Sequence, residues 1–585
     1  MLRRSLHLGR RCAARNGFSR VCRPAALRQL SLPATTSPVF SSRWITQASS
    51  RLREGEHASS QAAAFSASGD TIYALSTAQG QAGIAVIRIS GPACIDVYKA
   101  LCPSKSIPKP RYAAVRSLYD PDGDVGSNVL DHEALVLYFP APRTVTGEDV
   151  LELHIHGGSA TVKATLAAVP RCVAKHLVRY ADPGEFTKRA FINNRLDLGQ
   201  IEALSDVLAA ETEQQRRAAI RGSSGVLGRT YDEWRQQLLL ARGEIEALID
   251  FSEDQHFDES QSELLQNVTV MVGEMLHSIR MHEQGSQRSE LLRNGIRLAL
   301  LGPPNVGKSS LMNLIVGREA SIVSGEAGTT RDIVEASLDI RGYLCSFADT
   351  AGFRSRASGE EGPIGAVEQE GIRRARQKAL ESNVVMVLAS VEAVGGRPHI
   401  QYDKETLDIA SQAEACMVVI NKRDAADRQT FSRLLDEFRQ TITKQHPKLA
   451  GVEVLPISCK RAQTMSRVGD NDDPGGIQKL VSSVAETFAT LTDLPANLQD
   501  LLGVTERQRQ LLVECKEHLA DFMAEAQPGG HEAQAQAQAR DADPLLAAEH
   551  LRYAADCLAR ITGKGEGGDV EDVLGVVFEK FCVGK

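Results

Sequence analysis

The segment GPPNVGKS, residues 302–309, fits the pattern G-x-x-x-x-G-K-[ST] and decides the fold of the region around it. The apolar stretch Ile296–Leu301 precedes it and a helical pattern at 310–316 follows, which is the strand–loop–helix context that such a pattern needs. Glycines let the backbone N–H groups of this loop turn towards phosphate oxygens. Lys308 adds positive charge beside the β- and γ-phosphates, and Ser309 offers a hydroxyl to Mg²⁺. The sequence therefore predicts a phosphate-binding loop.

Four further motifs follow in a fixed order. GTTRD at 328–332 offers Thr330 as a second hydroxyl for Mg²⁺, and DTAG at 349–352 ends the apolar strand predicted at 343–347. NKRD at 421–424 follows the strand predicted at 416–420, and SCK at 458–460 follows the last predicted strand. Strand and helix alternate from 296 to about 458, which indicates a parallel sheet.

Asp424 selects the base. Its carboxylate can accept two hydrogen bonds from the N1–H and N2–H₂ groups of guanine, and adenine lacks that pair of donors. The sequence thus predicts a GTP site in a Ras-like P-loop domain. The predicted nucleotide-binding residues are Asn305, Val306, Gly307, Lys308, Ser309, Ser310, Ser324, Thr329, Thr330, Asp349, Thr350, Ala351, Gly352, Asn421, Lys422, Asp424, Ser458, Cys459 and Lys460.

The residue after DTAG bears on hydrolysis. A Ras-like site has a water-orienting glutamine near this position, but Phe353 stands here, and a phenyl ring cannot orient water. Either hydrolysis is negligible or another group assists it. Glu368, which leads into a helix predicted at 371–380, is an available carboxylate, and a solvated glutamate at a helix start is the alternative interpretation.

Composition narrows the class of protein. The 585 residues exceed the length of a single small module, and no apolar run approaches the ~18 residues of a membrane-spanning helix. Residues 1–53 contain eleven Arg and no Lys, Asp or Glu, which is typical of a mitochondrial transit peptide; a basic arm that binds nucleic acid is the alternative. Removing those eleven charges from 67 Lys+Arg leaves 56 against 74 Asp+Glu, or −18, which argues against broad nonspecific binding of nucleic acid.

Other regions carry weaker signals. Residues 70–190 mix short alternating strands, such as 84–89 and 150–155, with Gly and Pro turns, which indicates an α+β domain. Helical patterns flank the α/β block, at 194–292 and after 493, so we expect that block to be inserted into one helical bundle. Residues 527–542 are a low-complexity insertion, and an apolar stripe between 570 and 581 predicts a final helix.

The whole pattern resembles the mitochondrial form of the tRNA-modification GTPase family known as MnmE or TrmE. Besides the nucleotide motifs, the resemblance is carried by DTI at 70–72, GIAVIRISG at 83–91, TGEDVLE at 146–152, DPGEFTKRAF at 182–191, RLDL at 195–198 and FCVGK at 581–585. It implies a leader at 1–66, a tetrahydrofolate-binding and dimerising α+β domain at 67–193, a helical domain at 194–293 and 489–585, and a G domain at 294–488.

The resemblance also implies a reaction and its partners. In the mitochondrial matrix, with an FAD-containing MnmG-type protein and a folate one-carbon donor (5-formyl- or 5,10-methylene-tetrahydrofolate), the family adds a carboxymethylaminomethyl or taurinomethyl group to C5 of the wobble uridine of tRNA. The chain is expected to work as a homodimer.

Residue roles follow from the matching motifs. Glu368 matches the catalytic glutamate, although about seven extra residues precede it, and Ser309 and Thr330 match the Mg²⁺ ligands. The implied potassium site comprises Asn305, Ser324, Glu326 and Thr329, and the implied folate site comprises Arg88, Glu152, Arg195 and Lys585. For Arg88 and Glu152, a strand-face salt bridge is the alternative. Cys582 has either a chemical role or that of a buried small hydrophobe.

Two alternatives of other classes remain open. One is a regulatory or ribosome-assembly GTPase without RNA chemistry. The other is a self-sufficient folate-dependent tRNA methyltransferase with a regulatory G domain.

Overall fold

The computed structural model describes residues 69–564, with gaps at 124–127, 174–176, 252–260, 323–336, 349–376, 378, 465–472 and 527–542, and also describes Gly584. The predicted leader, the low-complexity stretch, the final helix and most of the helix predicted at 371–380 lie outside these residues. Within the described part, no helix combines the length and apolar character needed to cross a membrane.

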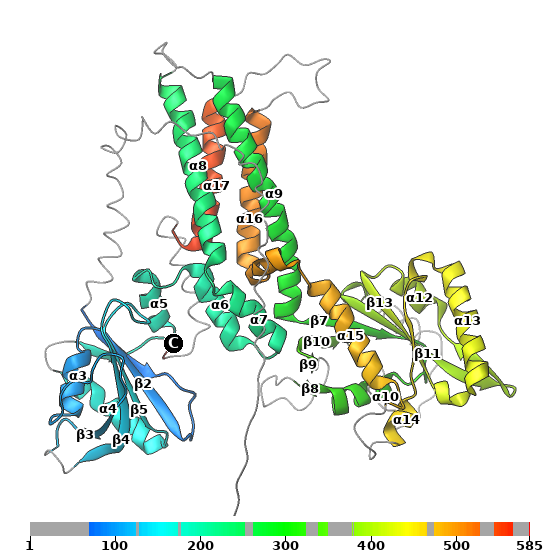
Figure 1. Ribbon diagram of the computed structural model, residues 1–585, viewed down its shortest axis with the longest axis horizontal. Helices are drawn as coiled ribbons and strands as arrows, with labels where there is room; N and C mark the ends of the chain where they lie inside the picture. Colours follow the sequence, from blue (N-terminus) through cyan, green and yellow to red (C-terminus); the bar gives the residue numbers. More distant parts are fainter. Residues whose placement is uncertain are drawn as a thin grey trace, which may run out of the picture. The chain divides into compact units, whose positions relative to one another are not determined.

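The N-terminal region forms a six-stranded sheet with helices against it (Figure 1). The strand order is β3-β4-β5-β2-β1-β6, and β1 pairs with β6 in parallel while the other neighbours are antiparallel. The elements are β1 (Thr71–Leu75), β2 (Ile84–Ser90), α3 (Cys94–Leu101), β3 (Ala114–Tyr119), β4 (Val129–Phe139), β5 (Val150–His156), α4 (Ser159–Ala168), β6 (Val178–Tyr180) and α5 (Glu185–Ile192). The strands predicted at 84–89 and 150–155 are confirmed, and each extends one residue further.

Helices dominate the second region. They are α6 (Leu198–Ala209), α7 (Glu213–Gly222), α8 (Val226–Phe251) and α9 (Gln261–Asn294), followed much later by η5 (Ala496–Gly503), α16 (Glu506–Ala526) and α17 (Pro544–Thr562). The start of α6 is set by a capping box, in which Asp197 accepts from the Gln200 backbone N–H at 2.7 Å and the Gln200 side chain accepts from the Asp197 N–H at 3.0 Å. Such a cap satisfies backbone donors that a helix start leaves unpaired.

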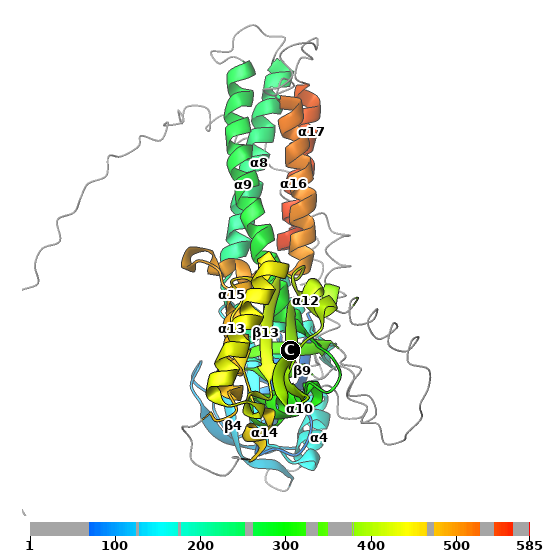
Figure 2. The same ribbon diagram turned by 90° about the vertical axis from the view of Figure 1, so that its right-hand side faces the viewer.

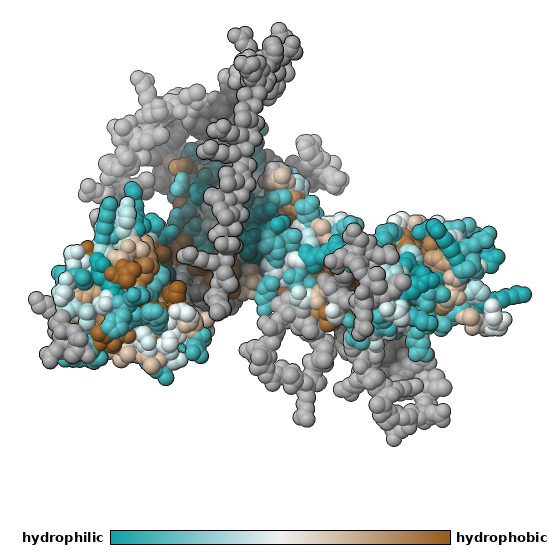
Figure 3. Space-filling model, turned by 60° about the horizontal axis from the view of Figure 1, so that its bottom comes forward, coloured by the Kyte–Doolittle hydropathy of each residue, from teal (hydrophilic) through white to brown (hydrophobic). Residues whose placement is uncertain are grey.

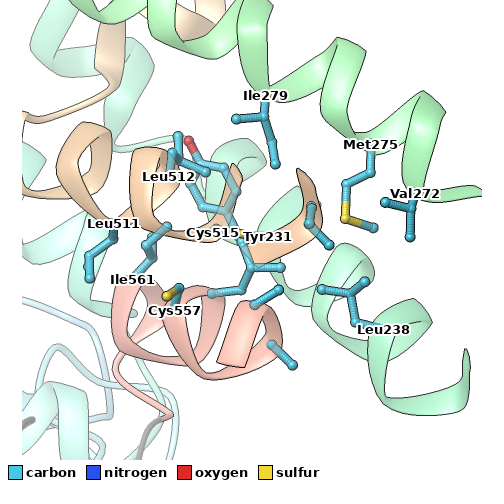
Figure 4. Close-up of a cluster of buried hydrophobic side chains, with 14 of the residues drawn as sticks. Tyr231, Leu238, Val272, Met275, Ile279, Leu511, Leu512, Cys515, Cys557 and Ile561 are labelled. Carbon is cyan, nitrogen blue, oxygen red and sulfur yellow. The ribbon is translucent and has the colours of Figure 1, made fainter. Parts of the chain in front are cut away.

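One apolar core joins the helices before 294 to those after 494. Figures 1 and 2 show α8, α9, α16 and α17 running side by side as a bundle. Figure 4 shows Tyr231 and Leu238 from α8, Met275 from α9, and Cys515 and Cys557 from α16 and α17 gathered in that core. Neither half of the bundle can bury its apolar face without the other.

A buried imidazole makes this core sensitive to acid. His282 of α9 is 8% exposed, its Nδ1 lies 3.1 Å from the Tyr231 hydroxyl, and its ring contacts Trp234. Burial lowers the pKa of His282 from 6.5 to about 4. In the unfolded chain the ring takes up a proton near its ordinary pKa, so stability that is complete above that pKa is lost as the pH falls towards 4.

We therefore expect the bundle to lose about 2 kcal/mol of stability between pH 7 and pH 5 through this group. The measurement is urea unfolding followed by the fluorescence of Trp234, which lies beside the ring. His282→Gln should flatten this pH dependence, whereas His277→Gln, at an exposed position of the same helix, should leave it unchanged. An equally steep dependence in His282→Gln would assign the acid sensitivity to other groups.

The third region is an eight-stranded sheet whose main path is β14-β13-β11-β7-β10-β9-β8, with β12 paired to β11. The neighbours from β14 to β10 are parallel. The elements are β7 (Ile296–Leu301), α10 (Lys308–Leu314), β8 (Ala320–Ile322), β9 (Ser337–Ile340), β10 (Tyr343–Ala348), β11 (Val384–Val394), β12 (Arg397–Gln401), α12 (Lys404–Ala410), β13 (Ala415–Asn421), α13 (Arg428–Gln445), β14 (Val454–Pro456), α14 (Cys459–Thr464) and α15 (Ile477–Thr492). The strand predicted at Ile296–Leu301 is confirmed without change.

Two apolar layers cover this sheet. One contains Leu298 and Met386 from the strands with Leu311 and Phe488 from α10 and α15, and the other contains Val387 of β11 with side chains of α12 and α13. The helix predicted at 310–316 starts earlier, at Lys308, and gives way to a π-helical turn at Ile315–Glu319. The start shifts because Gly307 takes the left-handed conformation and acts as N-cap.

Candidate nucleotide and folate sites

The phosphate loop is tightly fitted to its neighbours. Gly302 has a φ of +150°, and a Cβ there would lie 2.2 Å from the carbonyl oxygen of Leu388. Gly307 has a φ of +99°, and a Cβ there would lie 2.3 Å from Nδ2 of Asn421. Both positions exclude any side chain. The two glycines of the motif thus let the loop lie directly against β11 and β13.

Lys308 lies over this loop. Its Nζ donates to the carbonyl oxygens of Gly302 and Pro303, at 2.6 and 2.9 Å. Burial lowers the pKa of Lys308. Carbonyl oxygens carry no net charge, so these two contacts do not neutralise the ammonium charge, which can attract an anionic ligand.

Asn421 links the phosphate loop to the base-recognition loops. It is 2% exposed, its Nδ2 donates to the Val306 carbonyl at 2.8 Å, and its Oδ1 accepts from the Cys459 N–H at 3.1 Å. The predicted role of Asn421 in nucleotide binding stays a prediction, and the structure adds a second role, because its polar atoms join the phosphate loop to the loop at Cys459. Reasoning from sequence missed this role because it depends on three separate segments meeting.

Asp424 lies at the same edge of the sheet. It accepts a hydrogen bond from the buried hydroxyl of Ser458, whose oxygen also accepts from the Arg461 N–H at 3.1 Å. Lys422, with a φ of +58°, pairs with Glu392 of β11 and thereby lowers the pKa of that carboxyl. Burial raises the pKa of the Cys459 thiol to about 11, so this residue stays neutral at physiological pH.

These contacts bring three loops together, after β7, β13 and β14. In a parallel sheet the carboxyl ends of strands form the ligand-binding edge, as expected for a nucleotide site. Other predicted members lie outside the described residues and stay predictions: Ser324, Glu326, Thr329, Thr330, Asp349, Thr350, Ala351, Gly352 and Glu368.

In the N-terminal sheet, Arg88 and Glu152 face each other. They are paired positions of β2 and β5, and Nε of Arg88 lies 3.0 Å from Oε1 of Glu152. His154 lies 3.3 Å from the other carboxylate oxygen, and the guanidinium lies 5.9 Å from the ring centre of Phe186. The strand-face salt bridge is thus present, with side chains 22% and 15% exposed.

Of the other two implied folate residues, the structure describes Arg195 but not Lys585. Arg195 donates to the Thr144 carbonyl at 3.0 Å, and no hydrogen bond or ion pair within the described part of the chain joins it to Arg88 or Glu152. Lys585 and Cys582 lie outside that part. Gly584 lies against β1, where its carbonyl accepts from the Ser76 hydroxyl at 2.9 Å. Gly584 therefore contacts the N-terminal sheet.

The DPGEFTKRAF segment builds an ion-pair network that the sequence analysis did not predict. Arg189 lies 2.9 Å from Asp70 and 3.1 Å from both Glu148 and Glu185, and Arg179 also contacts Asp70 and Glu185. Although burial favours the protonated carboxyl, hydrogen bonds from Arg179, the Asp182 N–H and Arg189 hold the pKa of Glu185 below its ordinary value. The signal in the sequence was the spacing of Glu185 and Arg189, which are four residues apart and can form an ion pair on one face of a helix.

Comparisons with known proteins cover most of the chain. The family described as the GTP-binding protein TrmE N-terminus matches residues 71–195, and the MnmE helical domain matches residues 198–582. A zebrafish (Danio rerio) protein named 5-taurinomethyluridine-[tRNA] synthase subunit GTPB3, mitochondrial, is 36% identical over 88% of this chain and 93% of its own length.

Two further relatives are named tRNA modification GTPases. Mitochondrial mss1 of Schizosaccharomyces pombe is 36% identical and MnmE of Parvibaculum lavamentivorans is 38% identical, each over 88% of this chain and over 95% and 100% of its own length. A solved structure of Era with MgGDPNP and 16S ribosomal RNA nucleotides is 26% identical over 39% of this chain and 67% of that chain, with a TM-score of 0.22. From the matched regions and these relatives, the chain belongs to the MnmE (TrmE) family of tRNA modification GTPases.

Proposed function

We propose that this chain is the GTP-hydrolysing subunit of a mitochondrial enzyme that modifies C5 of the wobble uridine in tRNA. One observation carries the proposal. The same chain contains the loops assembled around Lys308, Asn421 and Asp424 and the N-terminal and helical regions of this family. Zebrafish and fission-yeast relatives named as mitochondrial support the compartment, as does the Arg-rich leader, and we place the protein in the matrix.

Mass spectrometry of mitochondrial tRNA from cells lacking the protein tests this function. The expected result is a wobble uridine without its C5 substituent, restored by the native chain. Unchanged wobble uridines together with intact GTP hydrolysis would instead favour the ribosome-assembly alternative.

We also propose that the N-terminal region binds a tetrahydrofolate, 5-formyl or 5,10-methylene, and that an FAD-containing MnmG-type protein is the partner. The partly exposed Arg88–Glu152 pair supports the folate site, because its guanidinium suits a carboxylate and its carboxylate suits a pterin amino edge. The contact between Ser76 and Gly584 supports a contribution from the neighbouring Lys585. Reconstitution of tRNA modification from this chain, tRNA, GTP and folate, without the flavoprotein, tests the need for the partner. Modified uridine in that mixture would favour the self-sufficient methyltransferase.

Homodimerisation through the N-terminal region is supported by its surface. Apolar side chains are exposed there, among them Ile84 at 63%, Val115 at 60% and Leu177 at 65%, and Figure 3 shows brown patches on this part of the molecule. Exposed apolar clusters commonly mark protein interfaces. The domain boundaries predicted from the sequence stay part of this proposal.

We propose that two cations, Mg²⁺ and K⁺, bind at the nucleotide site. The hydroxyls of Ser309 and Thr330 are suitable Mg²⁺ ligands, since Mg²⁺ prefers oxygen donors. Asn305, with a φ of +63° in the phosphate loop, is the structurally described member of the proposed potassium site, and Ser324, Glu326 and Thr329 are the others. A monovalent cation beside the phosphates supplies charge where other GTPases place an arginine.

Replacing K⁺ by Na⁺ should therefore slow GTP hydrolysis by about 10- to 100-fold, because the loss of a fitted cation removes stabilisation of developing charge. The measurement is the steady-state rate of phosphate release in matched chloride salts. Nucleotide affinity in the two salts serves as the control and should change little. Equal rates in both salts would remove the role given to Asn305.

Glu368→Ala should lower the rate of GTP hydrolysis by about 100-fold with little loss of nucleotide affinity, since a positioned carboxylate acts on the attacking water. Single-turnover hydrolysis and calorimetric binding measure the two quantities separately. Glu381→Ala, at an exposed position further along, is the matched control. Normal turnover in Glu368→Ala would move the catalytic role elsewhere.

A further inference from the structure

Two helices of the bundle bring three metal-ligating side chains together, using none of the residues assigned above. His518 and Asp521 belong to α16 and His550 belongs to α17, and one ligand atom of each lies within 4.8 Å of those of the other two. We propose that this cluster is a binding site for a divalent transition-metal ion, with Zn²⁺ as the ion that its ligands fit best.

Helix geometry keeps the three groups in place. His518 and Asp521 are three residues apart, so they project from one face of α16 on neighbouring turns. His550 lies in the second turn of α17, and the two imidazole rings are 6.5 Å apart between centroids with an interplanar angle of 33°. Tetrahedral Zn²⁺ with bonds of about 2.0–2.1 Å would set its ligand atoms about 3.3 Å apart, so the three side chains would have to close in from their present spread of up to 4.8 Å.

A second observation points to a missing ligand. Nδ1 of His550 is buried and has no hydrogen-bond partner within the described residues. Buried polar atoms in native proteins are nearly always paired, and an unpaired one costs free energy. Coordination of an ion by this nitrogen would give it the partner that it lacks among the described residues.

The ligand set selects the type of ion. Mg²⁺ and Ca²⁺ prefer a shell of oxygen atoms, whereas imidazole nitrogen suits Zn²⁺ and its neighbours in the first transition row. His518 and His550 are partly buried and Asp521 is exposed, so the carboxylate side faces solvent. Three protein ligands leave a fourth position for water, which makes this an open site.

A bound ion would cross-link α16 and α17, because its ligands come from both helices. The ion would link Asp521 of α16 to His550 of α17. It would thus close a loop that includes the chain segment between these two helices. An ion that binds the folded but not the unfolded chain stabilises the fold in proportion to its affinity. The site therefore links metal supply to the stability of the bundle.

The test uses the full chain, freed of nucleotide and dialysed against a chelator. Calorimetric titration with ZnCl₂ should show one ion per chain, and titration with MgCl₂ should show none in the absence of nucleotide. Asp521→Asn should weaken zinc binding at least about tenfold, a loss that even outer-shell partners of metal sites can cause. The double variant His518→Ala/His550→Ala should abolish it, while His277→Ala on α9 should bind as the native chain does.

A second readout is the urea midpoint followed by Trp234 fluorescence, which zinc should raise in the native chain and in His277→Ala but not in the double variant. Equal zinc uptake by the native chain and by Asp521→Asn would overturn the proposal. So would the absence of zinc uptake by the native chain. If the double variant loses its helical circular dichroism, Asp521→Asn decides, because it keeps the size and the solvent exposure of the residue it replaces.

Discussion

Asp424→Asn should weaken GTP binding by about 10²- to 10⁴-fold and make xanthosine triphosphate the preferred ligand. The carboxylate is expected to accept two hydrogen bonds from guanine, and each bond to a charged group contributes about 1.5–3 kcal/mol. An asparagine presents an N–H group to one of those guanine donors. Xanthine has a carbonyl in place of the guanine amino group, so it suits the amide. Calorimetric titration with both nucleotides measures the exchange.

The fold should survive this substitution. Asp424 receives a hydrogen bond from the Ser458 hydroxyl, and the side-chain oxygen of an asparagine can accept the same bond. Asp436→Asn, at an exposed position of α13, is the control and should bind GTP normally. A variant at position 424 that kept its guanine preference would contradict the assignment of base recognition to this residue.

Arg189→Ala should destabilise the N-terminal sheet by about 3–5 kcal/mol. The side chains of Arg189, Asp70 and Glu185 are 11%, 5% and 11% exposed, so removing the cation leaves carboxylates poorly solvated and partly unpaired. Hydrogen–deuterium exchange of peptides from β1 and β5, read by mass spectrometry, measures the local stability that is lost.

Arg171→Ala is the matched control for this effect. Arg171 pairs with Asp120 and Asp122 at the surface, where its side chain is 40% exposed, and solvent-exposed pairs contribute little to stability. Similar exchange in both variants would show that the Arg189 network adds no more than an ordinary surface pair.

The features predicted well from the sequence are those that a short stretch determines. The phosphate-loop pattern and the flanking strand Ile296–Leu301 are local, because apolar content and glycine positions set strand and turn directly. The α+β character of residues 70–190 follows likewise from alternation in single strands such as β5.

What sequence reasoning missed depends on contacts between distant segments. The bonds from Asn421 to Val306 and Cys459 exist only once β7, β13 and β14 are adjacent. The Arg189 network likewise needs Asp70, Glu148 and Glu185 to meet across three segments. The His518, Asp521 and His550 cluster was missed for the same reason, since only helix pairing brings α16 to α17.

The shared core of the bundle has a consequence for synthesis. The helices α8 and α9 are translated before α16, and residues 295–505, about 211 residues, separate the end of α9 from the start of α16. At ~5–20 residues per second, a ribosome needs tens of seconds or less to produce that stretch. During this interval the apolar faces of α8 and α9 lack the helices against which they pack in the folded protein. We therefore expect the nascent chain to need chaperones until α16 and α17 have been synthesised.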